Sequence, residues 1–167
     1  MTENAIKLPI ITPITVKPDW IDENDHVNFS RYFQIFIEAT DRLCEQLGTD
    51  SDDYLASGST TFTGDYHVTF LNEANLGDPL VCHSFVLAVS DKKLVLRHEL
   101  RHAEEGWVSA VAEELILSVD FESRRVAPFP QHMYEKLQGL ALSADEAAAL
   151  PNQARAVSLT GPRPERT

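Results

Sequence analysis

The stretch Trp20-Ile21-Asp22-Glu23-Asn24-Asp25-His26-Val27-Asn28 runs directly into Phe29–Leu47, and the rest of the chain is arranged around this junction. Within the second segment, apolar or small residues recur at the three- and four-residue spacing of one helical face. They stand at positions 29, 32, 33, 36, 40, 43, 44 and 47. Asn28 is a favourable N-cap and Gly48 a favourable stop, so the pattern predicts a helix over 29–47, about 30 Å long.

The segments on either side of this helix have the pattern of strands. Pro13 and Pro18 place the first of them at a sheet edge. From Thr61 onward, apolar and polar residues alternate, and turn residues separate the runs. The predicted strands are Ile10–Trp20, Thr61–Phe70, Leu80–Val89, Leu94–His102 and Trp107–Phe121. Short turns make neighbouring strands antiparallel, so the sequence predicts an α+β fold in which one long helix packs on an antiparallel sheet.

The C-terminal part has a different character. Gln131–Leu140 is predicted to be a helix, Ser143-Ala144-Asp145-Glu146 matches a capping box, and 151–167 has the composition of a disordered tail. We therefore expect one folded domain over 1–140, followed over 141–167 by a helical turn and a disordered tail. A single helix cannot cover the second faces of all the strands, so we also expect a homo-oligomer.

The charge balance excludes some classes of partner. Lysine and arginine total 14 against 26 acidic residues, which gives a formal net charge of −12. Nucleic-acid binding depends on basic residues, so it is not expected. No apolar run reaches the ~20 residues that span a bilayer, and no secretory signal is recognisable. Cys44 and Cys82 lack metal-type spacing and read as buried reduced thiols, which favours a cytoplasmic location.

The junction also carries the residues best suited to chemistry. Asp22 lies on a polar loop six residues before the predicted N-cap. The first turn of a helix has unpaired N–H groups and a partial positive charge, which can stabilise the oxyanion formed when a carbonyl is attacked. A carboxylate beside it can act as a nucleophile or as a base for water. Loops of this kind also serve simply to cap helices, and the residue types alone leave both readings open.

The string Asp22-x-x-x-His26-Val27-Asn28-x-x-x-Tyr32 resembles the hotdog-fold thioesterases of the 4-hydroxybenzoyl-CoA type, in which such a motif precedes a long helix. The likeness extends over roughly residues 10–137, and it is greatest to thioesterases of carnitine breakdown, described as acting on betainyl-CoA. Its further elements are Trp20-Ile21-Asp22-Glu23-Asn24, Arg31-Tyr32, Ala39-Thr40-Asp41, Phe62-Thr63-Gly64-Asp65-Tyr66-His67, Leu71-Asn72-Glu73, Asp91-Lys92-Lys93 and Val119-Asp120.

The resemblance implies a central helix wrapped by an antiparallel sheet, assembly into dimers or tetramers, and hydrolysis of acyl-CoA without a metal or cofactor. It places the catalytic carboxylate at Asp22 and the oxyanion-binding amides near Asn28 and Phe29. His26 and Tyr32 belong to the same motif and are candidate substrate contacts. The chain departs from the family in one notable way, because Asp25 stands where the family has a glycine that tolerates positive φ.

Other residues are secondary candidates for binding the acyl-CoA substrate. Asp65 and Glu73 would orient water or pair with a cationic acyl group, unless they are ordinary solvent-facing acids; Asp65 is also shorter than the glutamate of the closer relatives. Trp20 and Tyr66 offer a cation–π surface or, alternatively, core packing. A basic cluster is suited to the CoA phosphates but equally to plain surface charge, and its members are Lys92, Lys93, Arg97 and Arg101.

Two rival functions remain at this stage. His98-Glu99-Leu100-Arg101-His102 fits the zinc-peptidase motif, but the surrounding alternation predicts a strand, where positions four apart are separated by roughly 13 Å and cannot share one ion. The second rival is a non-catalytic hotdog protein that binds acyl-CoA, which the aspartate at position 25 favours.

Overall fold

The computed structural model describes residues 9–49 and 52–153. The helices and strands follow one another as β1 (Ile10–Thr15), a 3-10 turn η1 (Pro18–Trp20), α1 (Arg31–Leu47), α2 (Asp52–Ala56), β2 (Ser59–Phe70), β3 (Pro79–Val89), β4 (Lys93–His102), β5 (Val108–Asp120), α3 (Gln131–Leu140) and α4 (Ala144–Ala149). The predicted α+β architecture is confirmed, and strands β2 to β5 agree with the predicted ranges within two residues.

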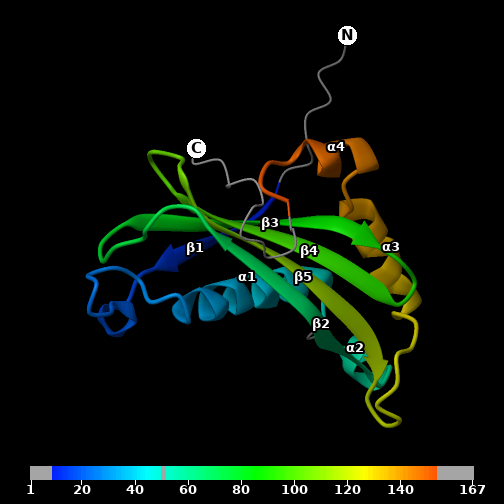
Figure 1. Cartoon of the computed structure of the whole chain (residues 1–167). Coiled ribbons are helices and arrows are strands. Elements are labelled where there is room, and N and C mark those ends of the chain that lie inside the picture. The colour runs from blue at the N-terminus through cyan, green and yellow to red at the C-terminus, as the bar shows by residue number, and fades with distance from the viewer. Residues whose placement is uncertain (1–8, 50–51, 154–167) are drawn as a thin grey trace.

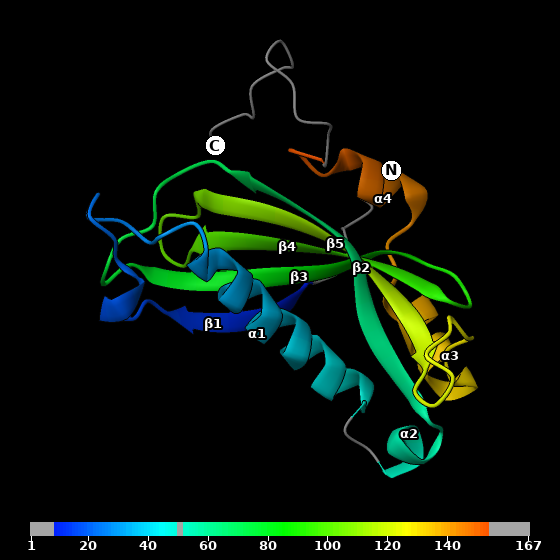
Figure 2. The ribbon, with the colours of Figure 1, turned by 60° about the horizontal axis from the view of Figure 1, so that its bottom comes forward.

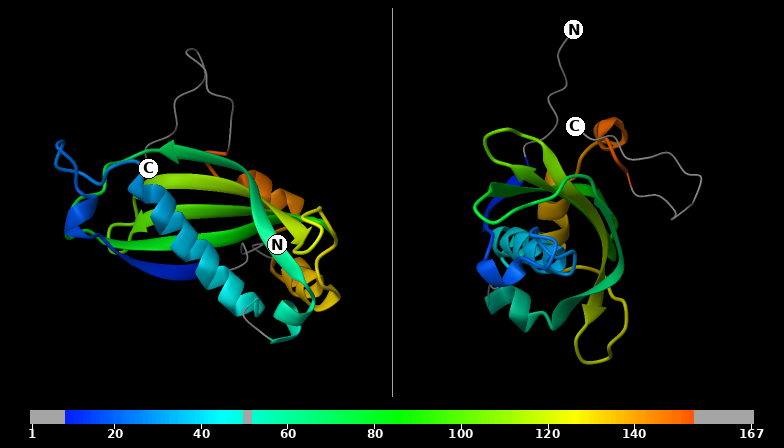
Figure 3. Two further views of the ribbon diagram at one scale, coloured as in Figure 1. Left: turned by 90° about the horizontal axis from the view of Figure 1, so that it is seen from below. Right: turned by 60° about the vertical axis from the view of Figure 1, so that its left-hand side comes forward.

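The strands form one antiparallel sheet in the order β1-β3-β4-β5-β2, so β1 and β2 are its edges. Helix α1 lies obliquely across one face of this sheet, and the sheet curves around it (Figures 1 and 2). The end-on view in Figure 3 shows the helix inside that curve. The position of β1 at an edge agrees with its proline, because Pro13 has no N–H to donate to a neighbouring strand.

Helix α1 begins two residues later than the sequence pattern predicted. The residue before its first turn is Ser30, and the predicted N-cap Asn28 lies in the preceding loop. At the other end, Gly48 terminates the helix with a φ of 80°, as expected of glycine at this position. The buried face is made by Tyr32, Ile35, Phe36, Ala39, Leu43 and Leu47.

The apolar stripe of α1 is also wider than one buried face. Phe33, which the pattern assigned to the buried stripe, is 40% exposed, and Ile37 is 56% exposed. Ile35 and Ala39, which the pattern did not assign to the buried stripe, are fully buried. The helix therefore has one apolar face against its own sheet and a second one directed to solvent.

The first predicted strand is too long. Strand β1 ends at Thr15, and the chain then forms the 3-10 turn, because Pro18 at the start of that turn favours a helical φ. Trp20 at the end of the turn is only 4% exposed and packs in the core beside α1. The turn thereby directs the following residues, 21–30, to the N-terminal end of α1.

The C-terminal part closes the other end of the molecule. Helix α3 buries Met133 and Leu137 in a cluster with the last turns of α1. Ala141 then pairs with Val86 of β3, and α4 begins with the predicted capping box at Ser143. Helix α4 and residues 150–153 lie on the sheet face opposite α1 (Figures 1 and 3). The rest of the predicted tail lies outside the described residues. Among the helices described, none has the length and apolar character needed to cross a membrane.

Candidate active site

The loop before α1 is a short closed turn. Ile21 and Val27 form an antiparallel bridge, and the Asp22 amide donates to the His26 carbonyl over 3.1 Å. The Asp25 amide donates to the Asp22 carbonyl over 3.1 Å, and Asp25 has a φ of 62°. This left-handed backbone explains why a glycine would suit the position. Aspartate is among the side chains that adopt it at moderate energy, so the loop closes in spite of the departure.

The Asp22 carboxylate is held firmly by its neighbours. One oxygen accepts from the Asn24 amide over 2.9 Å, and the other accepts from the Asn28 side-chain amide over 3.0 Å. His26 Nδ1 lies 3.9 Å from the first oxygen. The hydrogen bond from the Asn24 amide, with further help from Asn28 and His26, holds the pKa of Asp22 below its ordinary value of 3.8. The carboxylate is therefore ionised at neutral pH, with its side chain 12% exposed.

The amides at the start of α1 differ in their availability. The Asn28 amide donates to the Trp20 carbonyl over 2.8 Å, so it is not the oxyanion donor that the motif predicted. The Ser30 amide is also engaged, because it donates to Asn28 Oδ1 over 3.0 Å. Within the described part of the chain, the Phe29 amide has no acceptor. Phe29 is thus the residue of the predicted pair whose amide can donate to an incoming oxygen.

A cavity of about 540 Å³ lies beside this loop and the start of α1. The Val27 amide donates to the Ala74 carbonyl over 2.8 Å, which joins the loop to the segment that follows β2. Glu73 therefore lies in the cavity wall together with His26, whereas Asp22 is not among the lining residues. The lining residues are His26, Val27, Phe29, Tyr32, Phe70, Leu71, Asn72 and Glu73.

Two of the predicted aromatic contacts lie outside this cavity. Trp20 is 4% exposed and packs in the core. The hydroxyl of Tyr66 is buried without a hydrogen-bond partner, and the ring of Tyr66 packs against Phe33 with 5.3 Å between centroids. Asp65 is exposed near the middle of β2, where its carboxylate accepts from the Tyr66 amide over 2.8 Å. Trp20, Tyr66 and Asp65 all lie outside the wall of the cavity.

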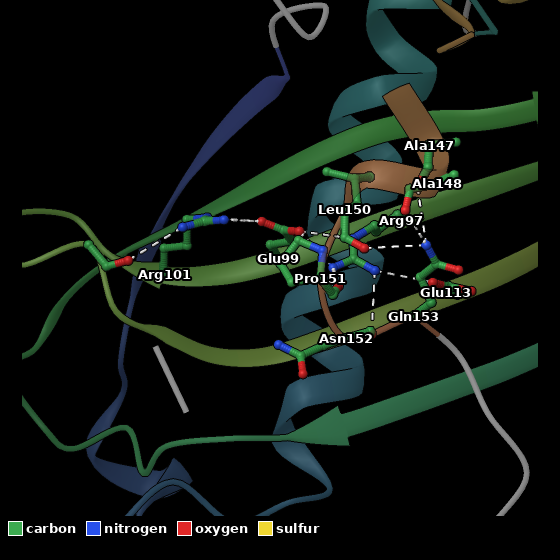
Figure 4. A network of polar contacts seen from close by, with 11 residues as sticks. Arg97, Glu99, Arg101, Glu113, Ala147, Ala148, Leu150, Pro151, Asn152 and Gln153 are labelled. Carbon is green, nitrogen blue, oxygen red and sulfur yellow. Dashed lines mark hydrogen bonds and ion pairs between the residues drawn. The ribbon is translucent and has the colours of Figure 1, made fainter. Parts of the chain in front are cut away.

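The predicted phosphate-binding cluster is separated by the fold. Arg97 is 0% exposed on the sheet face opposite α1, so the predicted contact with CoA phosphates is wrong for this residue. Its guanidinium donates to Glu99 over 2.9 Å, to Glu113 over 3.2 Å, and to the Pro151 carbonyl (Figure 4). Lys92 and Lys93 are exposed, but they lie in the β3–β4 turn, at the end of the sheet away from the start of α1 (Figure 1).

The zinc-peptidase alternative fails on geometry. The motif His98–His102 lies along strand β4, as the alternation predicted. His98 Nδ1 is 2.8 Å from Ser84 Oγ, whereas His102 Nδ1 accepts from the Glu104 and Glu105 amides over 3.3 Å and 3.1 Å. The two imidazoles belong to separate hydrogen-bond networks and share no common centre.

Sequence reasoning missed two features near the site. Phe70, at the end of β2, lines the cavity, although its alternation with polar residues only marked it as a strand residue. Glu114 is buried on the α1 side of the sheet, where it accepts from Thr40 over 3.1 Å and from Thr63 over 2.7 Å. Thr40, the one polar residue in the predicted apolar stripe, was the available signal for this buried network.

The sequence matches the family model of the thioesterase-like superfamily over residues 16–137. A betainyl-CoA thioesterase of Pseudomonas aeruginosa is 32% identical over 136 residues, which cover 81% of this chain and 85% of the relative. An L-carnitine dehydrogenase/betainyl-CoA thioesterase of Agrobacterium fabrum is 34% identical over 139 residues. That match covers 83% of this chain but only 28% of the longer Agrobacterium protein.

Solved structures show the same fold. A Staphylococcus aureus protein in complex with CoA superposes with a TM-score of 0.73 at 23% identity, covering 96% of this chain and 98% of that protein. A 1,4-dihydroxy-2-naphthoyl-CoA thioesterase from Synechocystis gives a TM-score of 0.69 at 19% identity, covering 78% of this chain and 96% of the other. Many further chains of known structure also match this fold.

Proposed function

The chain belongs to the thioesterase-like superfamily and is a hotdog-fold acyl-CoA thioesterase, and we propose that it hydrolyses a small acyl-CoA with Asp22 as its catalytic carboxylate. The observation that carries this proposal is the junction of the loop and α1. It combines an ionised carboxylate, the Phe29 amide just before α1, which has no acceptor among the described residues, and a cavity of about 540 Å³. A cavity of this size falls in the range of small-molecule sites.

The chemistry follows from the roles of these groups. Asp22 takes a proton from water while the water oxygen attacks the thioester carbonyl, or the carboxylate attacks the carbonyl itself and water later hydrolyses the anhydride. In either case the carbonyl oxygen becomes an oxyanion, and the Phe29 amide donates to it. The C–S bond then breaks, and CoA leaves as a thiolate that takes up a proton. The proposal requires no metal or cofactor.

The test is Asp22→Asn, with free CoA detected by a thiol reagent. Because a well-placed acid–base group typically contributes about 10²-fold or more, we expect kcat to fall by at least that factor. Asp25→Asn is the matched control, since it removes a carboxylate from the same loop and keeps a residue that tolerates left-handed backbone. Full turnover by a folded Asp22→Asn protein would refute the assignment of the catalytic role.

The proposed substrate is betainyl-CoA or a similar small cationic acyl-CoA. The names of the Pseudomonas and Agrobacterium relatives support this choice. The cavity supports it as well, because Glu73 stands in its wall beside aromatic rings. A panel of acyl-CoA thioesters with neutral, anionic and cationic acyl groups would identify the substrate.

The proposed assembly is a homodimer in the cytoplasm. Phe33 and Ile37 form a solvent-directed apolar face of α1, next to the free edge strand β2, and a second copy would cover both. The two cysteines, Cys44 and Cys82, are free thiols, in keeping with a reducing compartment. Light scattering of the wild type and of Ile37→Glu tests this, because a charge at the centre of the face would shift a dimer toward monomer.

A further inference from the structure

The wall of the cavity has an unusual combination of side chains. Three of its residues are aromatic, namely Phe29, Tyr32 and Phe70, and Glu73 contributes a carboxylate. Among the described residues that line it, there is no lysine or arginine. Aromatic faces and a carboxylate attract a cation, and they offer nothing to an anionic acyl group.

Two of the three rings are placed so that a ligand can reach them, whereas Tyr32 is only 4% exposed. Phe29 is 66% exposed and Phe70 is 46% exposed, although both side chains are apolar. Tyr32 meets Phe70 edge to face, with 5.1 Å between the ring centroids and 82° between the planes. The hydroxyl of Tyr32 is fixed by Ser109 Oγ at 3.0 Å, so its ring is a rigid wall against which the Phe70 ring stands.

Two carboxylates belong to the segments that line the cavity. Burial raises the pKa of Tyr32, and the nearby carboxylate of Glu73 raises it further, which places that charge close to the aromatic group. The ionised Asp22 lies in the loop whose residues His26 and Val27 complete the wall. Phe29 joins the two functions, because its amide is the free donor at the helix start and its ring lines the cavity.

We infer that Phe29, Phe70 and Glu73, with the buried Tyr32 supporting the Phe70 ring, form the subsite that selects a quaternary ammonium group on the acyl chain. This inference rests on the proposed hydrolysis and adds the residues that determine its specificity. A trimethylammonium group has no hydrogen to donate, so a protein recognises it through ring faces and nearby negative charge. In a betaine-type thioester only one methylene separates this group from the carbonyl, which agrees with a cage that begins at Phe29 itself.

The test compares two substrates of the same shape. Betainyl-CoA and 3,3-dimethylbutyryl-CoA differ in one atom, because a positively charged nitrogen in the first replaces a neutral carbon in the second. We expect the wild type to prefer the cationic thioester by about tenfold or more in kcat/KM, as cation–π and charge attraction in a partly desolvated site predict.

Variants then test whether the subsite residues cause this preference. Glu73→Gln and Phe70→Leu are expected to lower the ratio of the two kcat/KM values several-fold, while Phe70→Tyr retains it. Glu122→Gln is the control, since this exposed glutamate lies in the turn after β5 at the other end of the sheet. Equal rates for both thioesters in the wild type, or an unchanged ratio in both Glu73→Gln and Phe70→Leu, would overturn the inference.

A binding measurement separates this inference from the proposed function. Calorimetry on the Asp22→Asn protein compares the affinities for the two thioesters without turnover. Tighter binding of betainyl-CoA that is lost on a second change, Glu73→Gln, supports the subsite even if the catalytic assignment proves wrong. Equal affinities would remove the subsite even if the chain releases CoA from both thioesters.

Discussion

Two charged clusters of this chain, the Asp22 loop and the network around Arg97, use their charges in opposite ways. Asp22 keeps two hydrogen bonds that lower its pKa, but it remains partly exposed, in the loop whose residues His26 and Val27 line the cavity. Arg97 is fully buried and is surrounded by Glu99, Glu113 and the carbonyls of Pro151 and Asn152 (Figure 4). A charge that is oriented by hydrogen bonds but still partly exposed is available for chemistry, whereas a charge that is fully buried among its partners is structural.

The largest effect is expected from breaking the enclosed network. Arg97→Leu removes one of the two guanidinium partners of the buried Glu99 carboxylate, Arg101 being the other, and breaking a buried ion pair typically reduces the free energy of unfolding by about 3–5 kcal/mol. Denaturant unfolding measures this loss. Arg42→Leu is the control, because its ion pair with Glu45 is more than half exposed on both sides and contributes about 0–1 kcal/mol. Similar losses in the two variants would contradict the distinction.

Glu114 is a second buried charged group, and its contribution to stability is expected to depend on pH. Burial alone would raise the pKa of Glu114, but hydrogen bonds from His98, Thr63 and Thr40 outweigh it and hold the pKa below 4.5. Because the folded-state pKa is the lower one, this carboxylate contributes stability above about pH 4.5, which is lost as the pH falls through the folded-state value.

Glu114→Gln should therefore lose about 1–3 kcal/mol of stability at pH 7, since it disturbs a buried network. The difference between variant and wild type should shrink below about pH 4.5. Unfolding curves at a series of pH values measure both effects. A difference that stays constant from pH 7 to pH 3 would show that the ionisation of this group plays no part.

For the Asp22 loop, the prediction concerns the pH dependence of activity. The pKa of Asp22 is lowered mainly by the Asn24 amide and also by the side chain of Asn28. The acid limb of kcat/KM should lie below pH 3.8 in the wild type, because the carboxylate must be ionised to act. Asn28→Ala should move the limb to higher pH, since it removes one hydrogen bond to the charged form. An acid limb that does not respond to Asn28→Ala would assign it to another group.

The smallest effect is expected at Asp25. Its φ of 62° is unfavourable for a residue with a Cβ, so Asp25→Gly removes strain from the folded state. The glycine also gives the unfolded chain more conformational freedom, which lowers the free energy of unfolding. The two contributions nearly cancel, so we expect a gain of about 0.5 kcal/mol in unfolding free energy and unchanged acyl-CoA hydrolysis. A severalfold rise in kcat would instead show that the charge of Asp25 opposes the reaction.

Much of the fold could be predicted from local patterns. The three- and four-residue spacing in 29–47 fixed the central helix, and alternation fixed the strands, because both signals repeat over many residues. The start of α1 was misplaced by two residues. The side chain of Asn28 does accept a hydrogen bond from a backbone amide, but that amide belongs to Ser30, which still precedes the helix. Propensity alone does not distinguish these two arrangements.

The site was predictable only where it is continuous in sequence. Asp22, His26 and Phe29 belong to one motif, but Phe70 joins them through the meeting of a strand end and a helix start. Arg97 was misassigned because the residues that cover it, Pro151 and Asn152, are 54 and 55 positions further along the chain. No pattern in β4 itself distinguishes an arginine that faces solvent from one that a distant segment will enclose.

The enclosure of Arg97 also has a consequence for the order in which the protein forms during synthesis. Its carboxylate partners follow within sixteen residues, but its carbonyl partners lie 54 and 55 residues later. At ribosomal rates of roughly 5–20 residues per second, about 3–11 s pass between the synthesis of Arg97 and that of the last of these carbonyls. Arg97 therefore gains its full set of partners only after all five strands of the sheet have been synthesised.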